Sequence, residues 1–109
     1  MEENKTLEEI AFSLIANSGD ARSYAFQALQ EAKNKNFEKS QELLAESKKC
    51  SREAHKIQTE LLIGEANGSG YEINILLIHA QDHLMTSILA GELIEDMIEM
   101  RKEINELRK

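Results

Sequence analysis

Apolar residues recur along most of the chain at intervals of three and four positions, the spacing of an α-helix that buries one face. Two short polar stretches, Asn34–Asn36 and Asn67–Gly70, interrupt this pattern. They divide the sequence into three predicted helices at about 6–33, 37–66 and 71–107, and no segment has the alternation of a strand. Because the first connection is so short, the helices that it joins must lie antiparallel. The pattern therefore predicts an all-α fold, an elongated antiparallel three-helix bundle.

The residues at the ends of the predicted helices support these boundaries. Thr6 is a suitable N-cap, and two glutamates follow it in the first turn, where the helix dipole favours negative charge. Gly68 and Gly70 can adopt the positive φ with which a helix often ends. Gly19 interrupts the first helix, where it either makes a kink or lets another helix approach closely; we expect one long helix.

The first two predicted helices each have one buried face. In the first helix this face consists of Leu7, Ile10, Leu14, Ala21, Ala25, Ala28 and Ala32. In the second helix it consists of Leu43, Ser47, Cys50, Ala54, Ile57 and Leu61. Aromatic residues make up 5% of the chain and tryptophan is absent, so this core is thin for one small domain. Oligomerisation is a common remedy.

The third predicted helix has two apolar stripes, which lie roughly 160° apart when each residue advances by about 100°. The first stripe consists of Ile73, Leu77, Ala80, Leu84, Ile88, Gly91, Ile94 and Ile98. The second stripe consists of Ile75, Ile78, Asp82, Met85 and Leu89. A helix of a monomeric bundle needs only one such stripe. We therefore expect the second stripe to face other copies of the chain, with the third helix at the centre of a homo-oligomer.

Asp82 is the polar exception in the second stripe, between Ile78 and Met85. A carboxylate in such a seam must be protonated, hydrogen-bonded or bound to a cation, because an unpaired buried charge is costly. Several copies of Asp82 around a symmetry axis would repel one another, and a shared hard cation such as Mg²⁺ would relieve that repulsion. A polar residue that only fixes register and oligomer number, as buried asparagine does in coiled coils, is an alternative compatible with the metal.

His79 and His83 lie four residues apart, so both side chains reach the same side of the third helix, beside the Asp82 seam. A histidine at the rim of a seam is partly shielded but within reach of an external partner. From the residues alone, these are either histidines that react with a partner or hydrogen-bonded interface histidines. A zinc site is less favoured, because only His55 and Cys50 could complete it.

The charge and composition of the chain narrow its partners and location. Its 109 residues carry a formal net charge of −7, which argues against nucleic acid and against an anionic membrane surface. No apolar run approaches the roughly 20 residues of a membrane span, and the polar segment Met1–Glu9 does not read as a secretory signal. The single cysteine, Cys50, fits a reducing cytoplasm. The length predicts one domain, residues 1–109.

Three stretches of the sequence make up a more specific signature. They are His79-Ala-Gln-Asp-His-Leu-Met-Thr86, Ala54-His-Lys-Ile-Gln-Thr59 and Gly19-Asp-Ala-Arg22. Together they resemble the enzyme IIA subunits of the lactose/cellobiose (diacetylchitobiose) class of the bacterial sugar phosphotransferase system. The resemblance covers essentially the whole chain in one register, with the three stretches on three different helices.

The resemblance implies a homotrimer with the third helix near its axis. It implies that His79 is phosphorylated, on Nε2, by the phosphocarrier protein HPr. The phosphoryl group would then pass to a cysteine of the cognate IIB protein during sugar uptake. Asp82 of the three subunits would share one Mg²⁺ at the axis, and Gln81 and His83 would support the phosphohistidine. Such a subunit would be a cytoplasmic phosphotransferase component that does not itself insert into the membrane.

Two other functions are compatible with the sequence. A histidine phosphotransfer domain of two-component signalling also carries a reactive histidine on a helix, but it usually has a Lys-Gly pair shortly after that histidine and a four-helix bundle. Here Asp82 and His83 occupy the corresponding space, and only three helices fit the chain. A non-catalytic trimeric helical adaptor, in which His79 does no chemistry, is the third hypothesis.

Overall fold

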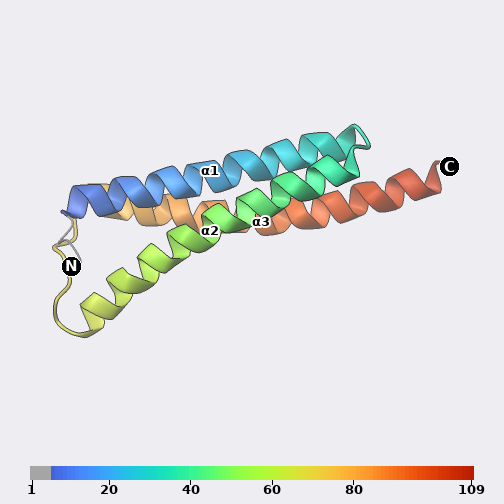
Figure 1. Ribbon diagram of the computed structural model, residues 1–109. Helices are drawn as coiled ribbons and strands as arrows, with labels where there is room; N and C mark the ends of the chain where they lie inside the picture. The colour runs from blue at the N-terminus through green and yellow to red at the C-terminus, as the bar shows by residue number, and fades with distance from the viewer. Residues whose placement is uncertain (1–5) are drawn as a thin grey trace.

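The structure, a computed structural model, describes residues 6–109, and the polar start of the chain, residues 1–5, lies outside the described part. Three helices run antiparallel along a rod of 58 × 25 × 20 Å: α1 (Leu7–Lys33), α2 (Phe37–Ala66) and α3 (Ile75–Leu107) (Figure 1). The described residues contain no strand, so the expected all-α three-helix bundle is confirmed. None of the three helices is long and apolar enough to cross a membrane.

The helix ends agree with most of the capping signals. The Thr6 hydroxyl accepts from the Glu9 N–H at 3.1 Å, and the Glu9 carboxylate accepts from the Thr6 N–H at 2.9 Å, which is a capping box. α1 continues through Gly19 as one helix, as expected. Gly68 takes a positive φ of 78° after α2, whereas in the first turn Lys35 takes this conformation, with φ 67°. Gly70 does not adopt positive φ.

The sequence pattern predicts a start of the third helix that is several residues too early. α3 begins at Ile75 rather than near residue 71, because Asn74 is extended and caps the helix: its side-chain oxygen accepts from the Leu77 N–H at 2.8 Å. The residues before Asn74 belong to the connection that returns from the end of α2. Ile73, expected in the buried stripe, is therefore 76% exposed and contributes nothing to the core.

α1 lies between the other two helices and contacts both of them along its length. Its buried face consists of Ala11, Leu14, Ser18, Ala21, Ala25, Ala28 and Ala32, while Leu7 and Ile10 of the expected face are only half-buried. The alanines allow α2 to come close. Buried hydroxyls of Ser40 and Ser47 donate at 2.7 Å to the carbonyl oxygens of Ala28 and Ala21. Small side chains on α1 therefore set the spacing of the bundle.

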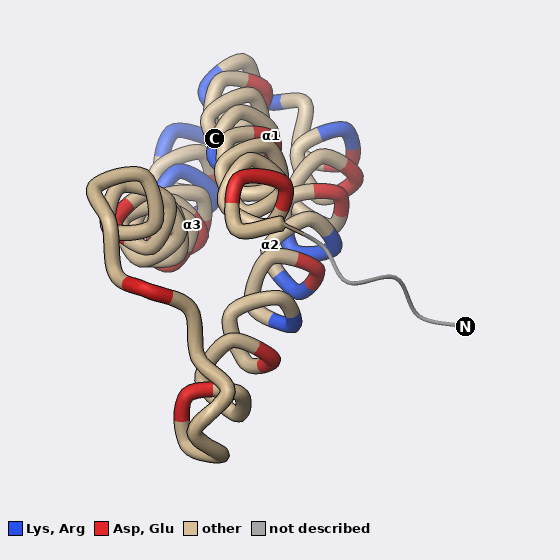
Figure 2. The backbone as a smooth tube through the Cα atoms, turned by 90° about the vertical axis from the view of Figure 1, so that its left-hand side faces the viewer, with Lys and Arg blue, Asp and Glu red and all other residues tan. Residues whose placement is uncertain are grey.

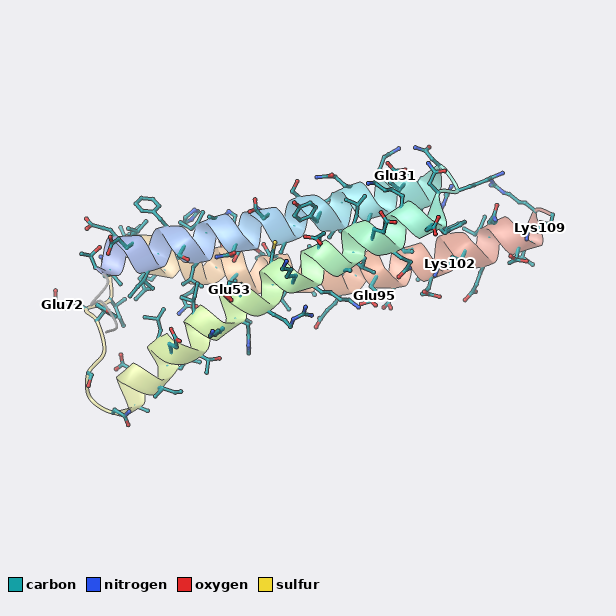
Figure 3. The ribbon with its side chains drawn as sticks, viewed as in Figure 1. Glu31, Glu53, Glu72, Glu95, Lys102 and Lys109 are labelled. Carbon is teal, nitrogen blue, oxygen red and sulfur yellow. The ribbon has the colours of Figure 1, made fainter. Side chains whose placement is uncertain are left out.

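α2 diverges from α3 toward its C-terminal end, although Gln58 of α2 still contacts Gln81 of α3. The two helices are close where Lys48 Nζ and a Glu95 carboxylate oxygen form an ion pair at 2.8 Å; Figure 3 labels Glu95 on α3. After Ala54 no residue of α2 is buried. Figure 2 shows α2 moving away from α3 until the connecting segment crosses back, and Figure 3 places Glu72 of this segment at the opposite end of the molecule from Lys109. α3 is thus covered mainly by α1.

One face of α3 stays uncovered by its own chain. Leu84 and Ile98 of the first stripe are fully buried, as expected. Large apolar side chains of the second face remain between 36% and 84% exposed, and these are Ile75, Ile78, Met85, Leu89, Leu93, Met97, Met100 and Ile104. We call these eight residues the outer face of α3. The two stripes expected for this helix are present, with one buried by α1 and the other in water.

Replacing Ala25 with leucine tests the close packing of α1. Ala25 has no exposed surface, so the larger side chain must push neighbouring atoms apart. We expect the free energy of unfolding to fall by about 1–3 kcal/mol, measured by chemical denaturation. Ala45→Leu, at an exposed position of α2, is the matched control and should change the value by less than about 0.5 kcal/mol. Equal stability of the two variants would show that α1 is not tightly packed.

Candidate functional site

His79 and His83 lie side by side on α3, between the outer face of that helix and α1. Their positions four residues apart place the rings on one side of the helix. The rings touch edge to face, with centroids 5.5 Å apart and planes at 69°. His79 is exposed and His83 is half-buried, so His79 is the ring that an external molecule can reach.

His83 is held from the other side by α1. Arg22 Nη2 lies 3.4 Å from His83 Nε2. Gly19, one turn before Arg22, also faces the ring: a Cβ at Gly19 would lie 4.0 Å from His83 Cε1. A Cβ there would make an ordinary van der Waals contact, so the approach does not require glycine, and the expected role of Gly19 in close helix packing stays a prediction. α1 supplies a cation beside the His83 ring.

The contact with Arg22 defines the protonation of His83. A guanidinium group can only donate hydrogen bonds, so His83 Nε2 must accept, and the ring proton of a neutral His83 is on Nδ1. Burial lowers the pKa of His83, and the charges of Arg22 and His79 lower it further, while Asp82 opposes this shift. Nδ1 itself is buried without a hydrogen-bond partner among the described residues. His83 is thus a neutral ring that rests against His79.

Gln81, the other residue expected to support His79, and the nearby Thr86 hydroxyl are both bonded elsewhere in the single chain. Gln81 accepts through Oε1 from Gln58 Nε2 of α2 at 2.9 Å, on the side of α3 away from Arg22. The Thr86 hydroxyl donates to the carbonyl oxygen of Asp82 at 2.9 Å. Of the predicted supporting residues, the structure therefore brings only His83 into contact with His79.

Arg22 and Gln58 are the two site residues that the sequence did not single out by role. Both lie in stretches that carry the family resemblance, but nothing in a helical pattern says which polar side chain of one helix meets a given residue of another. The structure places each of them at a half-buried position on its helix although it is polar.

Asp82 projects from the outer face of α3 and is exposed in the single chain. Its neighbours on that face, Ile78 and Met85, are 56% and 55% exposed. Within residues 6–109 no group of three or more histidine, cysteine, aspartate or glutamate side chains could hold a metal ion. Within these residues Asp82 is therefore not part of such a group.

Comparison with known proteins decides the family. A family model described as "PTS system, Lactose/Cellobiose specific IIA subunit" matches residues 9–102. The chain belongs to this family. The match extends over most of all three helices, and three helices are what the described residues form, so the family is preferred over the four-helix histidine phosphotransfer domains.

Relatives of this IIA subunit are named for different sugars. The chain is 43% identical over 102 residues to the N,N'-diacetylchitobiose-specific EIIA component of Escherichia coli (strain K12). The matched residues cover 94% of this chain and 88% of the relative. The chain is 43% identical over 94 residues to the lactose-specific EIIA component of Staphylococcus epidermidis, with 86% and 90% covered.

Solved structures show the same fold. The PTS cellobiose-specific enzyme IIA from Bacillus anthracis matches with a TM-score of 0.89 at 44% identity, over 94% of this chain and 95% of that one. A IIA(chitobiose) chain, solved in solution as a complex with HPr, matches with a TM-score of 0.81 at 40% identity, over 94% and 99% of the two chains.

The lowered pKa of His83 predicts a pH effect on stability. Between the folded pKa and the unfolded value of about 6.5, the unfolded chain binds more protons at this residue than the folded chain does. The free energy of unfolding should therefore fall as the pH drops below about 6.5, and this part of the slope should disappear in His83→Gln. Denaturation at a series of pH values measures it. An unchanged slope in the variant, or an NMR titration of His83 at or above 6.5, would contradict the assignment.

Proposed function

We propose that this IIA subunit carries phosphoryl groups in sugar uptake. His79 accepts the group from phospho-HPr and passes it to a cysteine of the cognate IIB protein. The observation that carries this proposal is the exposed ring of His79, which contacts the neutral ring of His83. His83 is in turn contacted by Arg22. Membership of the lactose/cellobiose family supports it. We place this activity in the cytoplasm.

The chemistry of imidazole suits this task. The unperturbed pKa of histidine is about 6.5, so near neutral pH the ring is largely neutral and one nitrogen is nucleophilic. We propose that this nitrogen is Nε2 of His79. The bond from phosphorus to the donor nitrogen breaks as the bond to His79 forms. In the onward transfer, the bond from phosphorus to His79 breaks as a bond to the thiolate sulfur of the acceptor forms. Catalysis of such a step rests on in-line positioning and charge compensation.

HPr is the proposed donor. The structural match with a IIA(chitobiose) chain that was solved together with HPr supports it. The formal net charge of −7 also suits a partner with a basic rim, because such complementarity raises the association rate more than the affinity. The proposed acceptor is a IIB protein of the same class.

We also propose that three copies assemble around α3, with Asp82 from each copy at the axis. The outer face of α3 supports this, because eight large apolar side chains remain in water until another chain covers them. Three carboxylates would fit one Mg²⁺, since that ion prefers oxygen ligands and no group of three candidate ligands lies together within residues 6–109 of one chain. The cation would offset the repulsion between the carboxylates. His79 would then lie at the rim, within reach of HPr.

Phosphorylation should depend on His79. When the protein is incubated with HPr, enzyme I and phosphoenolpyruvate, we expect acid-labile phosphate on His79, located by mass spectrometry. His79→Ala should lose the label completely, because the proposal places the transferred group on this ring. His55→Ala, which changes an exposed histidine of α2, is the control and should be labelled like the wild type. Label that survives in His79→Ala would overturn the proposal, and an unlabelled wild type would favour the adaptor.

Asp82→Leu separates the seam from the chemistry. We expect the variant to keep its fold and to stabilise the trimer in metal-free buffer by on the order of 1–4 kcal/mol, because three converging carboxylates are replaced by apolar contacts. The wild type should dissociate in chelator and reassemble with Mg²⁺, followed by sedimentation. Asp20→Leu, at an exposed position of α1, is the control and should behave like the wild type. Monomers in all conditions would refute both the trimer and the metal.

A further inference from the structure

Arg22 provides the only cationic contact to either histidine of the site among residues 6–109. Its Nη2 lies 3.4 Å from His83 Nε2, and the His83 ring packs against the ring of His79 with 5.5 Å between centroids. The ion pairs of the described residues all join lysines to glutamates elsewhere on the helices. The guanidinium and the ring that we propose to be phosphorylated therefore both contact the side chain of His83.

We propose that Arg22 is a catalytic residue of the phosphoryl transfer. Its guanidinium leaves His83 and binds the oxygens of the phosphoryl group on His79. This inference rests on the proposed function. In the step, the bond from phosphorus to the donor nitrogen breaks and the bond to the His79 ring nitrogen forms. Arg22 keeps all its protons throughout, and it contributes positive charge and hydrogen bonds to the oxygens.

Arg22 can leave its present partner at low cost. The distance of 3.4 Å to His83 Nε2 is longer than the roughly 2.7–3.2 Å of ordinary protein hydrogen bonds, and the acceptor is an uncharged nitrogen. Arginine bound to a phosphoryl group makes two parallel hydrogen bonds between opposite charges, each about twice as strong as a neutral one. A phosphoryl group on His79 is thus the better partner for the guanidinium.

α1 holds Arg22 where this exchange needs little movement. Arg22 and Gly19 are one turn apart, and both face His83. A Cβ at Gly19 would lie 4.0 Å from His83 Cε1, at ordinary contact distance, so the backbone of α1 runs close to the ring at this turn. Arg22 is half-buried, and a turn of its terminal group from His83 toward His79 is the movement that the proposal requires.

The charge that arrives with the phosphoryl group has no other described counter-charge nearby. It adds about −1.5 to −2 near neutral pH to a chain of formal net charge −7. Asp82, one turn from His79, adds repulsion. Gln81 is bonded to Gln58, and the Thr86 hydroxyl is bonded to a backbone carbonyl. The site otherwise lacks a permanent positive charge that can reach the phosphoryl oxygens. Arg22 of α1 supplies this charge.

Single-turnover transfer from phospho-HPr tests this role with Arg22→Gln, Arg22→Lys and a matched control. The control is Arg52→Gln, which removes the same charge from an exposed position of α2. We expect Arg22→Gln to lower the transfer rate at saturating phospho-HPr by about 100-fold, with the half-saturating concentration little changed. Arg22→Lys should recover part of the rate, because it restores the charge without the fork, and Arg52→Gln should match the wild type.

A second measurement needs no variant at the arginine and so does not depend on how the variants fold. The side-chain N–H signals of Arg22, followed by ¹⁵N NMR in the wild type, should shift and become protected from exchange when the protein is phosphorylated. The signals of Arg52 should not change. In His79→Ala, treated in the same way, the Arg22 signals should stay where they were.

The outcomes separate the two proposals. An unphosphorylated wild type would overturn the proposed function and this inference with it. If the wild type is phosphorylated on His79 but Arg22→Gln transfers as fast as Arg52→Gln, only the inference fails. It also fails if Arg22→Gln raises the half-saturating concentration alone, which indicates a docking role, or if the Arg22 signals do not respond to phosphorylation.

Discussion

The rest of the structure depends on the fact that α3 has two apolar faces and its own chain covers one. α1 lies against the inner face, where Leu84 and Ile98 are fully buried. α2 keeps a contact with α3 at Gln58 and then diverges from it, so it leaves the other side of α3 uncovered (Figure 1). A continuous row of exposed apolar side chains on a small protein marks an interaction surface. The proposed assembly around α3 follows from this constraint, because copies of the chain supply the missing cover.

The same constraint gives neighbouring residues of α3 different tasks. Asp82 lies on the outer face, where other chains would meet. His79 and His83 lie toward α1, where the close approach of that helix brings Arg22 to within 3.4 Å of His83. That approach goes together with the small residues of α1, above all its buried alanines. Packing between the helices therefore determines which side chains lie beside the two histidines.

Much of this could be predicted from the sequence because it depends on local pattern. Helical spacing, the Thr6 cap and the two polar connections gave the three helices, and the stripes of α3 gave its inner and outer faces. The predicted start of α3 was wrong because Ile73 fits the helical period of the apolar residues, whereas Asn74 is the residue that caps the helix. The contact between Arg22 and His83 could not be predicted, because it depends on the rotation and spacing of two helices rather than on either one alone.

Native mass spectrometry of the protein after incubation with enzyme I, HPr, phosphoenolpyruvate and Mg²⁺ tests the central claim most directly. It reports the number of chains and the number of phosphoryl groups in the same particle. We predict a particle of three chains that carries one phosphoryl group on each, since the proposed assembly places every His79 at its rim and encloses none in the seam. Single chains, or a trimer that accepts no phosphoryl groups, would contradict the division of α3 into a seam and a reactive rim.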